Sequence, residues 1–81
     1  MSHFLVIYDR ATGKARVQEF TGEHSADEAL DARFRAEHRY AGADIEVASL
    51  VADDIDALKA THSRYFVDVD VMIERLERLV S

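Results

Sequence analysis

Two segments near the start of the chain show the alternation of side chains that is typical of β-strands. From His3 to Asp9 both alternating sets are apolar, which predicts a strand in the middle of a sheet. From Lys14 to Phe20 polar residues recur at alternate positions, which predicts an edge strand. The residues between them include Gly13, and glycine suits the left-handed backbone of a hairpin turn. We therefore expect these two strands to form a β-hairpin.

A helix is expected between Ser25 and about Tyr40. Ser25 and Glu28 have the spacing of a capping box, in which the serine oxygen accepts from the Glu28 amide and the Glu28 carboxylate accepts from the Ser25 amide. Gly42 suits the left-handed position that follows a helix. The predicted apolar stripe consists of residues that recur on one side of the helix, namely Ala26, Ala29, Leu30 and Phe34.

A third strand and a second, shorter helix follow. Residues Asp44 to Val51 are largely apolar, and their alternation predicts a strand with two apolar faces. Asp53 is expected to cap a helix that ends near His62, because an aspartate oxygen can accept from the first free amides of a helix.

The C-terminal segment has two interpretations. Valine and aspartate alternate from Val67 to Val71, as in a strand, whereas the apolar residues beyond are spaced as in a helix. We favour a last helix from about Val69 to Val80, capped by Asp68. Its apolar surface comprises Met72, Ile73, Leu76, Leu79 and Val80.

The predicted order of elements is ββαβαα, within a single domain that comprises residues 1–81. With the first strand in the centre, the sheet has three antiparallel strands in the order 2-1-3. The crossover from the second to the third strand is expected to be right-handed, which would pack the helices on one face of the sheet. The fold class expected is therefore α+β, with an amphipathic C-terminal helix.

Composition and charge exclude several classes of protein. The net charge of −6 disfavours nucleic-acid binding, which depends on lysine and arginine contacts with phosphates. The chain has no cysteine, so disulfides and thiol chemistry are excluded. The longest apolar run, Phe4 to Tyr8, is far shorter than the roughly 18 residues of a membrane span. The first residues lack the pattern of a signal peptide, so we expect a cytoplasmic location without membrane contact.

Basic and aromatic residues from three segments are expected to meet at one end of the sheet. The hairpin turn and the ends of both predicted helices lie where the third strand begins, as a consequence of the predicted topology. The residues concerned are Arg10, His38, Arg39, Tyr40, His62, Arg64 and Tyr65. Guanidinium and phenol groups suit phosphate or carboxylate, so this rim is a candidate site for a small anion. The same residues can instead stabilise helix ends and pack beneath the core.

No motif for catalysis or for metal binding stands out in the chain. His38 and His62 lack an identifiable third ligand, so no zinc site is predicted. The acidic residues near Asp53 and Asp68 are explained by helix capping. We therefore predict no catalytic residue, no metal and no cofactor.

Two hypotheses about function follow. The first is a small non-enzymatic protein-interaction module that forms a homodimer, or binds a protein partner, through the C-terminal helix. That apolar surface could instead pack on the sheet of its own chain. The second hypothesis is a small-anion binding or enzymatic domain that uses the His/Arg/Tyr rim.

Overall fold

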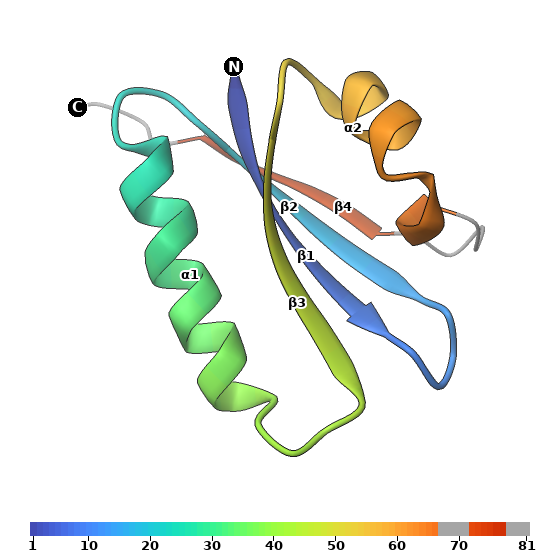
Figure 1. Cartoon of the computed structure of the whole chain (residues 1–81). Coiled ribbons are helices and arrows are strands. Elements are labelled where there is room, and N and C mark those ends of the chain that lie inside the picture. The colour runs from blue at the N-terminus through green and yellow to red at the C-terminus, as the bar shows by residue number, and fades with distance from the viewer. Residues whose placement is uncertain (67–71, 78–81) are drawn as a thin grey trace.

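The computed structural model describes residues 1–66 and, as backbone alone, residues 72–77 (Figure 1). Its elements are β1 (Ser2–Asp9), β2 (Ala15–Thr21), α1 (Ser25–Arg39), β3 (Ile45–Ala52), α2 (Ile55–Thr61), the 3-10 helix η1 (Ser63–Phe66) and β4 (Met72–Glu77).

The strands form one sheet in the order β3-β1-β2-β4. β1 is antiparallel to both of its neighbours, and its residue Val6 pairs with Val17 of β2 and Ala48 of β3. The predicted α+β class and the antiparallel order of the first three strands are confirmed. The hairpin turn also has the expected conformation, because Gly13 has a φ of 78° that other residues rarely adopt.

The prediction of a C-terminal helix is wrong for Met72–Glu77, which form the strand β4. β4 pairs in parallel with β2, and Val17 lies opposite Ile73. This pairing satisfies backbone groups of β2 that would otherwise need water, a gain that helical periodicity does not report. β2 is consequently an inner strand and not the predicted edge strand. Three residues of the proposed apolar surface, Met72, Ile73 and Leu76, belong to β4, whereas Leu79 and Val80 lie outside the described residues.

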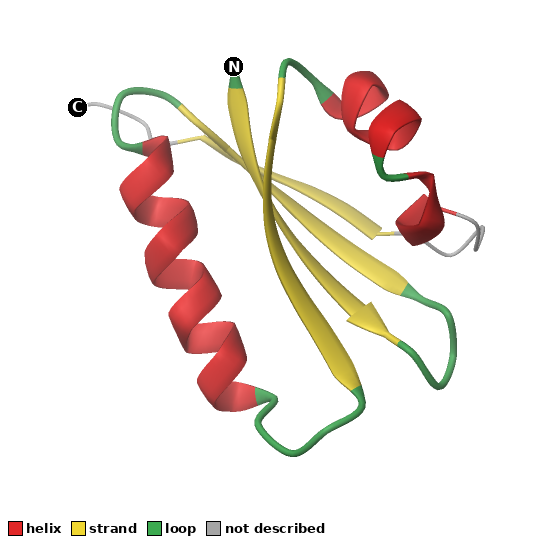
Figure 2. Cartoon of the chain, viewed as in Figure 1, coloured by secondary structure: helices red, strands yellow, loops and turns green. Residues whose placement is uncertain are grey.

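The two helices lie on opposite faces of the sheet, which corrects the prediction that they share one face (Figures 1 and 2). β2, β3 and β4 all run in the same direction. The connection from β2 to β3 crosses the sheet in one direction, and the connection from β3 to β4 crosses it in the other. Two crossovers of the same hand that run in opposite directions must cover opposite faces. The addition of β4 to the sheet therefore explains why α2 packs on the face opposite α1, and not on the predicted shared face.

The faces of the sheet are covered in different ways. On the α2 face, large side chains fill the core: Phe4, Val6, Val17, Leu58 and Tyr65. On the α1 face, Leu5 and Phe20 meet small helix residues, Ala29 and Ala36. α1 thus approaches the sheet through alanines.

This approach also corrects the predicted stripe of α1, because Leu30 and Phe34 are 47% and 61% exposed. The predicted capping box is not formed either. The Ser25 hydroxyl instead contacts Nδ1 of His3 at 3.0 Å and ties the start of α1 to β1. α2 is capped by Asp54, one residue after the expected Asp53, and its carboxylate accepts from the amide of Ala57 at 2.8 Å.

The contact between α1 and the sheet makes a prediction for stability. Replacement of the buried Ala36 by leucine inserts a large side chain between helix and sheet. We expect Ala36→Leu to lower the free energy of unfolding by about 1–3 kcal/mol, although leucine is a good helix former. Urea unfolding followed by circular dichroism measures this change. Ala26→Leu, at an exposed position of the same helix, serves as the control and should change stability by less than about 0.5 kcal/mol.

Candidate functional site

An ion-pair cluster centred on Glu46 occupies the end of the sheet at which β3 begins. Arg64 and Tyr65 of η1 both donate hydrogen bonds to the Glu46 carboxylate. Nη2 of Arg10, which follows β1, lies 3.6 Å from the same carboxylate, while its Nη1 lies 3.3 Å from Asp44. The sheet thus brings together three predicted site residues, Arg10, Arg64 and Tyr65.

The surroundings of Glu46 favour its charged form. The hydrogen bond from Tyr65 lowers the pKa of Glu46 most, and Arg64 and Arg10 lower it further, against the opposing effect of burial. Burial raises the pKa of Tyr65, and its hydrogen bond to the Glu46 carboxylate adds to this effect. The phenol therefore remains a donor and the carboxylate an acceptor at neutral pH.

Aromatic packing completes this cluster. The rings of Tyr8 and Tyr65 meet edge to face, with centroids 5.6 Å apart. The guanidinium carbon of Arg64 lies 4.7 Å from the centre of the Tyr65 ring. Glu46 thus pairs with both Arg10 and Arg64, and Asp44 pairs with Arg10 as well, so both arginines of this cluster have carboxylate partners within the chain.

The other predicted rim residues lie elsewhere. Arg39 and Tyr40 end α1 on the opposite face of the sheet, where the Arg39 guanidinium carbon lies 5.6 Å from the Tyr40 ring centre. His38 is exposed near the end of α1. His62 ends α2, and its carbonyl accepts from the amide of Tyr65 at 3.2 Å. The seven residues therefore do not form a single site.

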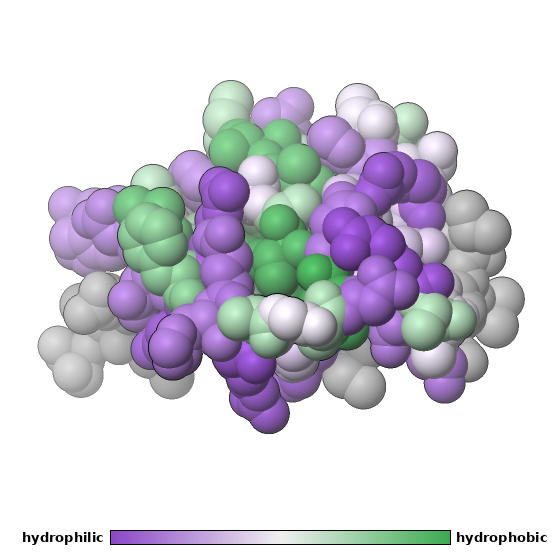
Figure 3. Space-filling view, turned by 60° about the horizontal axis from the view of Figure 1, so that its bottom comes forward, coloured by the Kyte–Doolittle hydropathy of each residue, from purple (hydrophilic) through white to green (hydrophobic). Residues whose placement is uncertain are grey.

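Figure 3 views the molecule from this end, which comes forward in that orientation. Hydrophobic surface is visible at the centre of the view, with hydrophilic residues around it. This end of the domain includes a concavity lined by apolar and aromatic residues, Ile7, Ala15, Tyr40 and Ile45, and by the charged residues Asp9, Lys14 and Arg16.

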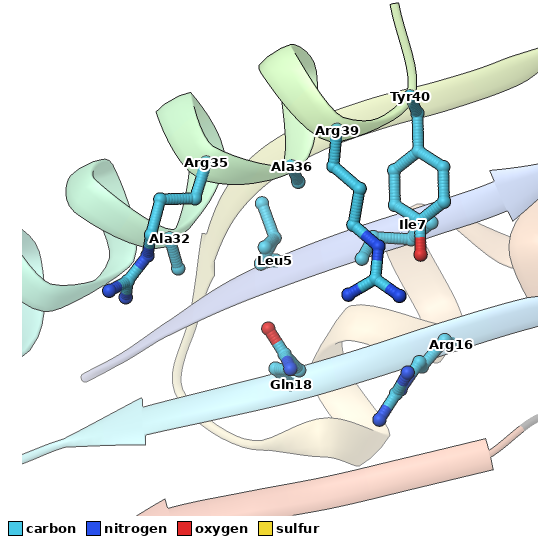
Figure 4. A pocket seen from close by; sticks show the side chains of 9 residues that line it. All are labelled: Leu5, Ile7, Arg16, Gln18, Ala32, Arg35, Ala36, Arg39 and Tyr40. Atoms are coloured by element: carbon cyan, nitrogen blue, oxygen red, sulfur yellow. The ribbon is translucent and has the colours of Figure 1, made fainter. Parts of the chain in front are cut away.

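A groove between α1 and β2 forms a cationic concavity (Figure 4). Its volume is about 290 Å³. Apolar side chains form its floor: Leu5, Ile7, Ala32 and Ala36. Polar and aromatic side chains form its walls: Arg16 and Gln18 from β2, and Arg35, Arg39 and Tyr40 from the end of α1.

Arg39 differs from the arginines at Glu46 in its surroundings. Arg39 extends from α1 toward β2, beside Tyr40 and between Gln18 and Arg16 (Figure 4). Within residues 1–66, no carboxylate forms an ion pair with Arg39, and no acidic residue lines the groove. Arg35, at the far end, is paired along the helix with Asp31 at 3.1 Å. The groove is therefore a cationic site above an apolar floor.

Sequence reasoning identified Arg39 and Tyr40 but missed Arg16, Gln18 and Arg35. Two local signals for these residues are present in the sequence. Arg35 and Arg39 are four residues apart and share one side of α1, while Arg16 and Gln18 are two apart and share one face of β2. These two pairs can be assigned to one groove only when α1 is known to lie over that face of the sheet.

Two specific features are absent from the described residues, a metal-binding cluster and a membrane-spanning helix. His, Asp and Glu side chains do not gather in groups of three that could hold a metal ion there. Neither α1 nor α2 has the length and hydrophobicity that crossing a membrane requires. Comparisons with protein-family models, with curated proteins and with solved structures find no match. The fold and the groove define a small α+β domain with an open cationic groove.

The Glu46 cluster predicts how stability depends on pH. We expect Glu46→Gln to lower the free energy of unfolding by about 1–2 kcal/mol at neutral pH, because Arg10 and Arg64 lose their carboxylate. The folded pKa of Glu46 is lowered, so its contribution is complete above the pKa of an unfolded glutamate, about 4.3. The contribution is lost as the pH falls through the lower folded value. Urea unfolding of both proteins over this pH range measures the difference.

Glu37→Gln is the matched control for this substitution. Glu37 pairs with Arg33 on the exposed surface of α1, where such a pair contributes about 0.3–0.5 kcal/mol. A loss in Glu37→Gln as large as the loss in Glu46→Gln would contradict a special role of the cluster.

Proposed function

We propose that this domain binds a small organic anion in the groove between α1 and β2. The observation that carries the proposal is the set of three arginines, Arg16, Arg35 and Arg39, above an apolar floor. Acidic residues are absent from the described lining of the groove. A guanidinium group presents paired N–H donors that match the two oxygens of a carboxylate or a phosphate.

The shape of the groove supports a ligand with an apolar part. Its volume of about 290 Å³ is near the lower end, roughly 300 Å³, of the pockets that hold small molecules in proteins. A hydrocarbon or aromatic group would contact Ile7 and Ala32 on the floor, while the charged group would lie beside Arg39. Tyr40 adds an aromatic wall and a hydroxyl donor at the same end (Figure 4).

The overall charge favours a small ligand over a polyanion. The chain carries 16 acidic and 10 basic residues, so a long polyanion would meet repulsion outside the groove. The polar groups that line the groove are guanidinium, amide and phenol groups, without a paired nucleophile and base among them. These features support binding, and not catalysis, as the activity of this groove.

The interaction-module hypothesis loses the surface on which it was based. Met72, Ile73 and Leu76 belong to a strand that pairs with β2, and not to a free helix. A helix over Met72–Glu77 therefore no longer supports this hypothesis.

Titration with matched carboxylates tests the proposed function. We expect benzoate to bind more tightly than acetate, because both offer one carboxylate and only benzoate covers the apolar floor. Nitrogen-15 NMR spectra should show saturable shifts at Gln18, Arg39 and Tyr40. Arg39→Gln is expected to weaken benzoate binding about tenfold, as the loss of a charge-assisted hydrogen bond of roughly 1.5 kcal/mol implies.

Arg33→Gln is the matched control, since it removes the same charge from α1 but leaves every groove residue in place. Equal weakening in the two variants would show that only general charge matters and would refute the groove as the site. Equal affinities for acetate and benzoate would remove the role of the floor.

A further inference from the structure

β3 forms one edge of the sheet, and its sequence lacks the usual protection of such an edge. In the part of the chain that the structure describes, β3 pairs with β1 on one side alone. Edge strands in proteins are commonly protected by lysine, proline or a short length. β3 has eight residues, and its segment 47–52 contains neither charge nor proline. Its outer backbone groups are thus available to a further strand.

Exposed apolar residues border this edge. Glu37 lines a concavity together with Ile45 and Val47, so this side of α1 faces β3. Leu30 precedes Glu37 by seven residues and shares that side of the helix, and Phe34, four residues after Leu30, lies next to Leu30 on the exposed surface of α1. Val51 of β3 is itself 51% exposed. Hydrophobic atoms protrude over α1 at the left of Figure 3.

We propose that two copies of this chain form a homodimer in which the β3 strands pair antiparallel across a two-fold axis. We call this region, formed by Leu30, Phe34 and β3, the β3 edge surface. An axis perpendicular to the sheet keeps α1 of both copies on the same face and makes the interface self-complementary. The inference does not depend on the proposed anion binding, because no residue of the β3 edge surface lines the arginine groove.

The position of α1 along β3 indicates that a second copy of this chain binds the β3 edge surface. His3 pairs with Val51 and contacts Ser25, so α1 starts above the Val51 end of β3. A helix rises about 1.5 Å per residue and a strand about 3.3 Å, and α1 runs back along β3. The middle of β3 therefore lies beneath about residue 30 or 31 of α1, next to Leu30. A two-fold axis at this point places Leu30 of one copy beside Leu30 of the other, with Phe34 one turn further along each helix.

Sedimentation velocity at tens of micromolar protein tests the dimer. We expect a species of twice the 9.2 kDa chain mass. Leu30→Glu and Phe34→Glu should each raise the dissociation constant at least about tenfold, since each places a charge in an apolar contact. Both residues are exposed in the single chain, so circular dichroism should show an unchanged fold. Ala60→Glu, at an exposed position of α2, is the matched control and should leave the dimer intact.

Disulfide trapping reads the register directly, because the chain contains no cysteine. Single cysteines are introduced in turn at Val47, Ala48, Ser49 and Leu50, and separately at Ile45. The residue on the axis faces its own copy within the roughly 4.4–6.8 Å between α-carbons that a disulfide requires, so it should cross-link under oxidation, whereas Ile45→Cys should not.

A monomer at 100 micromolar would overturn this dimer. A dimer that both glutamate variants leave intact, without cross-linking at any of the four central positions, would overturn it equally. Arg39→Gln lies outside the interface, so loss of anion binding in that variant with retention of the dimer would separate the two proposals.

Discussion

The double burial of β1 determines the architecture of this domain. Phe4 and Val6 are buried on one face of the strand, and Leu5 is buried on the other. A strand that is apolar on both faces has to be covered on both sides, because an exposed face would leave hydrophobic area in water. The chain meets this constraint with one helix on each face and with hydrogen-bonded neighbours on both edges of β1. The positions of the groove and of the free edge follow from how each face is covered.

The α2 face is closed by large side chains, whereas the α1 face is closed by alanines. Leu58 and Tyr65 fill the first face, and the Glu46 cluster secures its end. Alanines bring α1 close to the sheet, but they cover only a narrow part of this face. The apolar part of the face next to β2 therefore stays open and forms the floor of the groove. The same packing turns Leu30 and Phe34 outward. Both candidate surfaces therefore result from one feature, the small size of the residues between α1 and the sheet.

The sequence predicted those features that depend on neighbouring residues, and it failed where distant parts of the chain decide. The hairpin, the central position of β1 and the conformation of Gly13 follow from local alternation and turn chemistry. The last segment has the spacing of a helix, but pairing with β2 makes Met72–Glu77 a strand. The apolar stripe of α1 was predicted from the large hydrophobic residues Leu30 and Phe34, which are exposed. Alanine is only weakly hydrophobic, so its burial is hard to predict, although its small size permits the closest packing of helix and sheet. The groove combines residues from two elements, so its composition required the fold.

Arginine has two different roles in this domain, and the position of acidic residues distinguishes them. Arg10 and Arg64 meet a carboxylate of the chain itself, which holds η1 and the hairpin to β3. Arg39 points over an apolar floor that no described acidic residue shares. Arg39 is exposed at the end of α1, where a basic residue stabilises the helix and where its guanidinium lies 5.6 Å from the Tyr40 ring centre. Under the proposed function, an apolar ligand group would cover this floor with its charge beside Arg39, and exclusion of water there would strengthen the contact.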